Sequence, residues 1–245
     1  MNPTLIVNNI ETYIHHYHIL QGVSFIVPEN QVTMLLGRNG AGKTTTLRSI
    51  MKMSPARSGD IVLFGESIDQ SSTRDIANVG VSYIPENLGI FGSLTVAENM
   101  RVAAKHGPIN DARLNWIFGI FPEIKKFWYW PADRLSGGQK QMLAISRALI
   151  EPTRLLIMDE PSKGLAPFII ELLVEIIHEL KQLDTTMLIV EQNFKFSKSI
   201  GDNVVVMDNG KVVCQGTMAD FSDNEGMQVD YLGLNLAEHE QHKYE

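Results

Sequence analysis

Cysteine is almost missing from this sequence. Cys214 is its one cysteine among 245 residues, so neither an intramolecular disulfide nor a cysteine-based zinc cluster can form. That usage fits a reducing compartment. Long apolar runs are missing too, since none approaches the roughly 18 residues that cross a bilayer. Because the first residues also lack the basic start and apolar centre of a signal peptide, we expect a chain that neither spans a membrane nor is exported by itself.

Excess positive charge is also missing. The chain has 21 Lys and Arg against 28 Asp and Glu, a net charge of -7, which gives no long-range field to attract a nucleic-acid backbone. No nucleic-acid partner is therefore expected. Internal repeats and low-complexity segments are absent as well. With 44% hydrophobic and 20% charged residues, the chain has the balance of a globular protein, which excludes disorder, collagen and coiled coil.

Strand patterns of two kinds occur. Residues 5–10, 23–27 and 60–64 read as short, half-buried strands that pair antiparallel. Residues 94–149 have helical patterns and no convincing strand. This stretch is therefore expected to form a helical lobe inserted into a sheet domain.

The second kind of pattern is the continuous apolar run. Residues 32–36, 155–158 and 187–190 are such runs, which are typical of the inner strands of a parallel sheet. Helical spacing follows at 44–53 and again at 167–183, where Pro167 stands in the first turn. The second helix and its flanking runs predict a right-handed βαβ unit and hence an α/β fold.

A phosphate-binding loop connects the run at 32–36 to the helix at 44–53. The sequence GRNGAGKT matches G-x-x-x-x-G-K-[ST] in the strand–loop–helix context that the motif requires. Glycines let the backbone N–H groups surround an anion, Lys43 supplies charge for the β and γ phosphates, and the Thr44 hydroxyl reaches a Mg²⁺ ion. The flanking elements disfavour an ordinary glycine-rich turn. The predicted nucleotide-binding residues of this loop are Gly37, Arg38, Asn39, Gly40, Ala41, Gly42, Lys43, Thr44 and Thr45.

Two acidic residues end the run at 155–158. Asp159 is placed to hold Mg²⁺, because ligands of open α/β sheets bind at the strand ends. Glu160 comes one residue later and so points elsewhere, toward an attacking water, which suits a general base for hydrolysis. A solvent-exposed strand-terminal carboxylate is the alternative for Glu160, and the phosphate loop argues against it.

A second anion-binding helix end follows the helical lobe. Residues 135–139 read LSGGQ and precede a helical segment, in which Ser136 is suited to cap the helix while the glycines expose its first N–H groups. Two phosphate-type sites in one chain suggest a dimer, with each nucleotide between the loop of one subunit and this helix end of the other. A capped helix without further function is the alternative.

With these motifs in this order, residues 5–234 resemble the ATP-binding subunits of ABC transporters. The resemblance implies a P-loop NTPase domain over 1–234, with a parallel core sheet, an N-terminal antiparallel β subdomain, a helical subdomain at about 88–150, and a polar tail at 235–245. It also implies ATP hydrolysis in a head-to-tail dimer, in which Ser136 and Gly138 face the γ-phosphate of the partner's nucleotide. The helical lobe would dock on membrane subunits.

Three departures from the usual family pattern narrow the resemblance. Glu86 stands in place of the Q-loop glutamine, Gln192 in place of the switch histidine, and Ala166 in place of the D-loop aspartate. All three are similar to the LivF-type ATPases of branched-chain amino acid importers. Glu86 remains a good oxygen ligand for Mg²⁺ beside Thr44 and Asp159. Gln192 donates a hydrogen bond without charge, so its assistance to Lys43 and Glu160 in catalysis should be weaker and independent of pH.

The resemblance implies a function and partners. The chain would bind ATP and Mg²⁺ and power import of branched-chain or related amino acids from the cytoplasmic side of the plasma membrane. Its partners would be a second ATPase, identical or not, two permeases and, indirectly, an extracytoplasmic substrate-binding protein. The alternatives are a urea or amide importer, a soluble ABC ATPase that does not act in transport, and a nucleotide-binding regulator that does not hydrolyse ATP. The length, the charge and the presence of both Asp159 and Glu160 argue against the last two.

Two groups of aromatic residues, Tyr13 and the run at 127–130, each have two possible roles. The family stacks adenine on a tyrosine, and ungapped counting reaches Ile14, so that Tyr13 takes this role if the register shifts by one residue. Otherwise Tyr13 is a strand-end aromatic. The run at 127–130, FWYW, either packs inside the helical lobe or forms a patch that faces a permease. Three histidines at 15, 16 and 18 lack a completing carboxylate or thiol, so no metal cluster is expected there.

Overall fold

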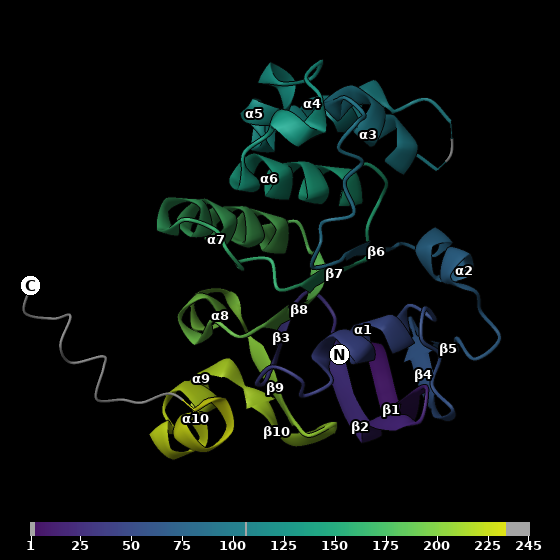
Figure 1. Cartoon of the computed structure of the whole chain (residues 1–245), viewed down its shortest axis with the longest axis vertical. Coiled ribbons are helices and arrows are strands. Elements are labelled where there is room, and N and C mark those ends of the chain that lie inside the picture. The colour runs from purple at the N-terminus through teal and green to yellow at the C-terminus, as the bar shows by residue number, and fades with distance from the viewer. Residues whose placement is uncertain (1–2, 106, 234–245) are drawn as a thin grey trace, which may run out of the picture.

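The computed structural model describes residues 3–105 and 107–233. Its N-terminal part is an antiparallel sheet in the order β2-β1-β4-β5, formed by β1 (Pro3–Ile14), β2 (Tyr17–Pro28), β4 (Ser58–Leu63) and β5 (Glu66–Ser67). Figure 1 shows this sheet at the lower right of the molecule. The three antiparallel strands expected from the sequence are confirmed. β1 and β2 are longer than expected because their hairpin pairs as far as Ile14 and Tyr17.

The core sheet has six strands in the order β10-β9-β3-β8-β7-β6. Three of its four interior strands are the apolar runs of the sequence, β3 (Val32–Leu36), β8 (Thr186–Glu191) and β7 (Leu155–Asp159), and these three pair in parallel. The other members are β6 (Val81–Ile84), β9 (Asn203–Asp208) and the antiparallel edge strand β10 (Lys211–Thr217). The prediction of a parallel core is confirmed.

Helices cover both faces of the core sheet (Figure 1). On one face, α1 (Lys43–Ile50) and α2 (Thr73–Asn78) pack with the N-terminal sheet around alternate residues such as Leu35 and Ile157. On the other face, residues such as Met34 and Met158 pack against the remaining helices. These are α3 (Val96–Ala103), α4 (Asp111–Ile120), α5 (Pro122–Lys126), α6 (Gly137–Ala148), α7 (Pro167–Gln182), α8 (Phe194–Ile200), α9 (Met218–Ser222) and α10 (Glu225–Leu232).

The helical lobe lies between β6 and β7 and contains α3 to α6, with the short 3₁₀ helix η1 (Ala132–Arg134). The described residues of this stretch contain no strand, and Thr95 and Pro131 form an isolated bridge there. Within 3–105 and 107–233, none of the helices has both the length and the apolar character to cross a bilayer. The polar tail expected at 235–245 falls outside the described residues.

Candidate functional site

The phosphate loop joins β3 to α1, and two of its glycines are required by close packing. At Gly37, which has φ +148°, an added Cβ would lie 2.3 Å from the Met207 carbonyl oxygen. Gly42 adopts φ +102° at the N-cap of α1, and its Cβ would lie 2.9 Å from Leu20. A side chain at either position would be strained, since L-residues rarely adopt these angles. The loop therefore keeps its backbone curled at the N-terminus of a helix, as an anion site requires.

Lys43 is buried inside this loop. Its Nζ atom donates to the carbonyl oxygen of Gly37 at 2.8 Å and to that of Arg38 at 3.1 Å. Burial lowers the pKa of the ammonium, although the nearby carboxylates of Glu160 and Asp159 oppose this effect. The charge is thus held where the phosphates of a nucleotide would lie.

Thr44 and Asp159 meet where α1 faces the end of β7. The Thr44 hydroxyl donates to Asp159 Oδ1 at 3.1 Å, whereas Asp159 Oδ2 is buried without a hydrogen-bond partner. Burial raises the pKa of Asp159, and the hydrogen bond from Thr44 acts against this rise. A buried carboxylate oxygen without a partner is costly unless a cation or donor reaches it, so the site suits a bound Mg²⁺ ion.

Glu86 follows β6 and lines a cavity together with Thr44 and Asp159. This cavity has a volume of about 400 Å³ and is also lined by Arg48, Tyr83, Pro85 and Asn87. All three residues predicted to hold the metal therefore line one cavity. Mg²⁺ commonly takes one or two protein carboxylates and fills its remaining positions with phosphate oxygens and water. Burial and the charge of Asp159 raise the pKa of Tyr83 to about 12, so its phenol stays protonated.

Glu160 lies at the end of β7 in a left-handed backbone conformation, with φ +51°. This angle is uncommon for a residue other than glycine and turns the chain sharply after Asp159. Its Oε1 atom accepts from Gln192 and lies 3.9 Å from Lys43 Nζ, while Oε2 accepts from Lys163 at 3.1 Å. Burial raises the pKa of this carboxyl, but the hydrogen bonds from Gln192 and Lys163 outweigh it and lower the pKa overall. Glu160 is therefore held as a carboxylate, the form that accepts a proton.

Gln192 follows β8 and connects two motifs. Its Nε2 atom donates to Asn39 Oδ1 of the phosphate loop at 2.8 Å and also to Glu160. The three residues predicted to be catalytic, Lys43, Glu160 and Gln192, are thus brought together by the ends of β3, β7 and β8.

Two further residues of this site have no role predicted from the sequence. Glu191 is 2% exposed, and its carboxylate accepts from the backbone N–H groups of Ser162 at 2.8 Å and Gln192 at 3.0 Å. It therefore fixes the turn after β7 against the turn after β8. Lys163 contacts Glu86 at 2.6 Å as well as Glu160. The sequence did contain a signal for this contact. A lysine stands in the loop after β7, and in the loop after β6 the anionic Glu86 replaces the usual glutamine, so that the two could form an ion pair.

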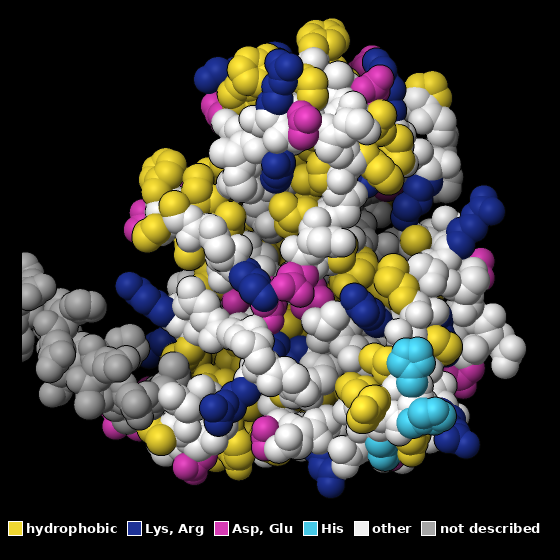
Figure 2. All heavy atoms as spheres, viewed as in Figure 1, with side chains coloured by type: hydrophobic (Ala, Val, Ile, Leu, Met, Phe, Trp, Pro, Cys, Tyr) yellow, Lys and Arg dark blue, Asp and Glu magenta, His cyan; other side chains and the backbone are white. Residues whose placement is uncertain are grey.

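Figure 2 shows the electrostatic character of this face of the molecule. Asp and Glu side chains gather near its centre, with Lys and Arg side chains on either side. Histidines gather on the same face at the lower right. Carboxylates at the centre need cations to offset their mutual repulsion.

Helix α6 starts within the LSGGQ sequence and is called the signature helix below. It begins with a reciprocal capping box. The Ser136 hydroxyl accepts from the Gln139 N–H at 3.3 Å, and the Ser136 N–H donates to Gln139 Oε1 at 2.9 Å. A Cβ at Gly138 would lie 2.8 Å from Ile169, so this glycine permits close packing of α6 on α7. Helix α6, which has Ser136 at its N-cap and Gly138 in its first turn, belongs to the helical layer on the opposite face of the core sheet from α1 (Figure 1).

Tyr13 lies on the β1–β2 hairpin and is 39% exposed. Its ring stacks on His18 with 4.3 Å between centroids, and the guanidinium of Arg57 lies 5.2 Å from its centroid. His18 also contacts Glu11. An adenine would need a free face of the Tyr13 ring, so the adenine-stacking role stays a prediction.

The aromatic run 127–130 is divided between interior and surface. Phe127 and Trp128 pack against the helical core, and Trp128 meets Phe118 edge to face at 5.1 Å. Tyr129 is 81% and Trp130 49% exposed. Phe127 and Trp128 thus suit packing inside the helical lobe, whereas Tyr129 and Trp130 suit a surface patch that faces a permease.

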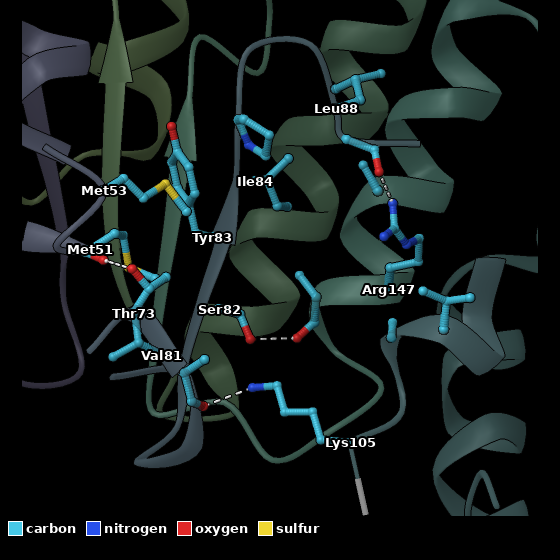
Figure 3. Close-up of a pocket in the computed structure, with 17 residues that line it drawn as sticks. Met51, Met53, Thr73, Val81, Ser82, Tyr83, Ile84, Leu88, Lys105 and Arg147 are labelled. Carbon is cyan, nitrogen blue, oxygen red and sulfur yellow. Dashed lines mark hydrogen bonds between the residues drawn. The ribbon is translucent and has the colours of Figure 1, made fainter. Parts of the chain in front are cut away.

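A second hollow lies between β6 and the helical lobe (Figure 3). Its volume is about 350 Å³, and it is lined by residues of β6, α3 and α6 and by the loop that carries Glu86. Arg147 of α6 points toward the Glu86 loop and donates to the carbonyl oxygen of Gly89 at 2.5 Å. Arg147 therefore connects the signature helix to the Glu86 loop.

The chain is similar to known proteins in sequence and in structure. A family model described as ABC transporter matches residues 20–163. The high-affinity branched-chain amino acid transport ATP-binding protein BraG of Pseudomonas aeruginosa is 34% identical over 92% of this chain and 98% of its own. The probable branched-chain amino acid transport ATP-binding protein LivF of Archaeoglobus fulgidus is 33% identical over 89% and 93%. A solved ATP-binding subunit of an ABC transporter superposes with a TM-score of 0.79 at 28% identity, covering 94% of this chain and 96% of that one.

Proposed function

The chain belongs to the ABC transporter family, and from that membership we propose that it powers the import of branched-chain or related amino acids. As an ABC ATPase, it binds and hydrolyses ATP to drive transport. The substrate class is inferred from two relatives that carry branched-chain amino acid transport in their names. Glu86, Gln192 and Ala166 support the same subfamily.

The observation that carries the hydrolytic part is the set of contacts around Glu160. Glu160 acts as the general base: it takes a proton from the water that attacks the γ-phosphate, because its carboxylate is ionised and is held by Gln192. Lys43 binds the β and γ phosphates. Gln192 donates to the γ-phosphate region without carrying charge.

Thr44, Glu86 and Asp159 would hold Mg²⁺ beside the loop. The buried, unpartnered Oδ2 atom of Asp159 supports this assignment. Lys163 occupies Glu86 Oε1, so the second oxygen of that carboxylate remains for the ion. When bound, Mg²⁺ neutralises charge on the phosphates.

The nucleotide-binding site would be completed by a second subunit. In a head-to-tail dimer, Ser136 and Gly138 would face the γ-phosphate of the nucleotide on the partner's loop. Their position in the helical layer, remote from the chain's own α1, supports use by a neighbour. Tyr13 would stack on the adenine after its ring separates from His18.

The helical lobe would receive the permeases, and the chain would then lie at the cytoplasmic face of the plasma membrane. Exposed Tyr129 and Trp130 support a contact of this kind, because aromatic residues are enriched in interfaces. Arg147 ties the helical lobe to the Glu86 loop, beside the hollow, and so offers a route from such a contact to the nucleotide site. An extracytoplasmic substrate-binding protein would take part indirectly, through the permeases.

ATP hydrolysis by purified full-length variants tests the site. We expect Glu160→Gln to lower turnover by about 10²- to 10⁴-fold while ATP binding is retained, because the base is lost. Lys43→Ala should weaken ATP binding itself. Glu66→Gln removes an exposed carboxylate from β5 and is the matched control, with turnover unchanged. Normal turnover in Glu160→Gln would contradict the base assignment, and normal ATP affinity in Lys43→Ala would contradict the loop assignment.

A further inference from the structure

Lys163 bridges two carboxylates that come from distant parts of the sequence. Its Nζ atom lies 2.6 Å from Glu86 Oε1 and 3.1 Å from Glu160 Oε2. The turn that carries it is fixed locally, since the Lys163 N–H donates to the Glu160 carbonyl oxygen at 3.1 Å. One ammonium therefore connects the loop after β6 to the end of β7.

The bridge offsets a repulsion that the sequence itself creates. Glu86 and Glu160 contact the same nitrogen, so their like charges face one another at close range, beside buried Asp159. Like charges at such distances disfavour each other strongly. Of the other cations nearby, Lys43 is turned toward carbonyl oxygens of the phosphate loop and lies 3.9 Å from Glu160. Arg48 lines the cavity of Glu86, and its charge acts on Asp159. Without Lys163, the Glu86 loop would be pushed away from the base.

We propose that Lys163 is a positioning residue for hydrolysis, which holds the Glu86 loop against the base Glu160 by bridging their carboxylates. The inference rests on the proposed function of Glu160. A neutral glutamine at position 86 would need no counter-charge, so Glu86 and Lys163 form a matched pair. Since Arg147 ties the same loop to α6, the bridge also joins the helical lobe to the base.

The role is geometric rather than a contribution to stability. The side chains of Lys163 and Glu86 are 57% and 49% exposed, and only that of Glu160 is largely buried, at 10% exposed. Ion pairs of so exposed an ammonium contribute little to folding. Misplacing a catalytic group by about 1 Å, in contrast, can lower a rate by up to about 10²-fold. The structure therefore predicts an effect on turnover without a matching effect on unfolding.

A double-mutant cycle tests the bridge. We expect Lys163→Met to lower kcat roughly tenfold with little change in KM for ATP, and Lys163→Arg to restore most of the turnover. In the Glu86→Gln background the loss caused by Lys163→Met should shrink to about twofold, because contacting residues are energetically coupled. Hydrogen exchange of residues 84–92, measured without nucleotide, should be faster in Lys163→Met.

The matched control is Lys126→Met. Lys126 pairs with Glu123 at the same spacing of three residues, on the helical lobe, and its loss should change neither turnover nor exchange at 84–92. An equal loss of kcat from Lys163→Met in both backgrounds, or unchanged turnover and exchange, would overturn the proposal. Failure of the proposed function is separate, because it would show as normal turnover in Glu160→Gln.

Discussion

Glu160 accepts hydrogen bonds from Gln192 and Lys163, and these contacts lower the pKa of its carboxyl in spite of burial. With a lowered pKa, the base stays ionised at and above neutral pH, so its own titration does not limit turnover there. Gln192 has no titratable group either. The neighbouring side chains therefore predict a rate that varies little through the range in which histidine titrates.

Gln192→His tests this reading of the site. The imidazole would titrate near pH 6.5, and its protonated form would add positive charge near the γ-phosphate. We expect kcat of the variant to be highest at low pH and to fall as pH rises between about 6 and 8, while the unaltered protein stays flat. Gln192→Met is the control without a titratable group. A step in the profile of the unaltered protein over this range would contradict the account.

Sequence patterns identify some of these residues and miss others for a physical reason. Lys43, Asp159 and Glu160 follow apolar strands, so their position at the sheet edge can be predicted from local sequence. The contacts of Lys163 and Glu191 depend on the turn after β7, in which Glu160 adopts a positive φ. No local pattern predicts that angle for a glutamate.

Capping connects the elements to function. α3 and α6 begin with the same reciprocal box, from Thr95 with Glu98 and from Ser136 with Gln139. The hydroxyl distances to the backbone N–H groups are 3.2 and 3.3 Å. Thr95 and Ser136 are thus comparable helix caps, but only Ser136 is also proposed to contact a nucleotide.

Thr95→Ala and Ser136→Ala therefore separate capping from binding. Each should lower the free energy of unfolding by about 1 kcal/mol, through loss of the side-chain acceptor. Turnover should fall only in Ser136→Ala, because that hydroxyl would also contact the partner's nucleotide. Thermal unfolding and ATPase assays measure the two effects. An equal loss of turnover in both variants would contradict the role of Ser136.

Strand patterns predict the centre of the core sheet better than its edges. β3, β7 and β8 are buried along their whole length, so each consists mostly of apolar residues. The four-residue β6 has only Val81 and Ile84 buried, and every residue of β10 is at least partly exposed. These edges are set by pairing with distant strands, which local periodicity does not encode. In contrast, β9 has four buried residues in succession. They form an apolar run like the one that predicts β3, so β9 could have been predicted from the sequence but was not.

At the scale of the whole molecule, the order of motifs along the chain predicts the two-lobed arrangement because the helical segment interrupts the sheet between β6 and β7. The sheet brings the ends of β3, β7 and β8 to one edge, where Lys43, Glu160 and Gln192 meet. The signature helix lies in the other layer, so each chain would present one half of two different sites. A molecule of this design is expected to act in a complex.

Co-purification from native membranes tests the central claim most directly. The tagged full-length protein, extracted in mild detergent, should bring down two permeases and an ATPase subunit, with a substrate-binding protein for branched-chain or related amino acids associated with them. ATPase activity of that complex should rise when the binding protein is loaded. Recovery with ribosomes, or as a lone protein free of membrane subunits, would contradict the transport function while leaving the ATP site intact.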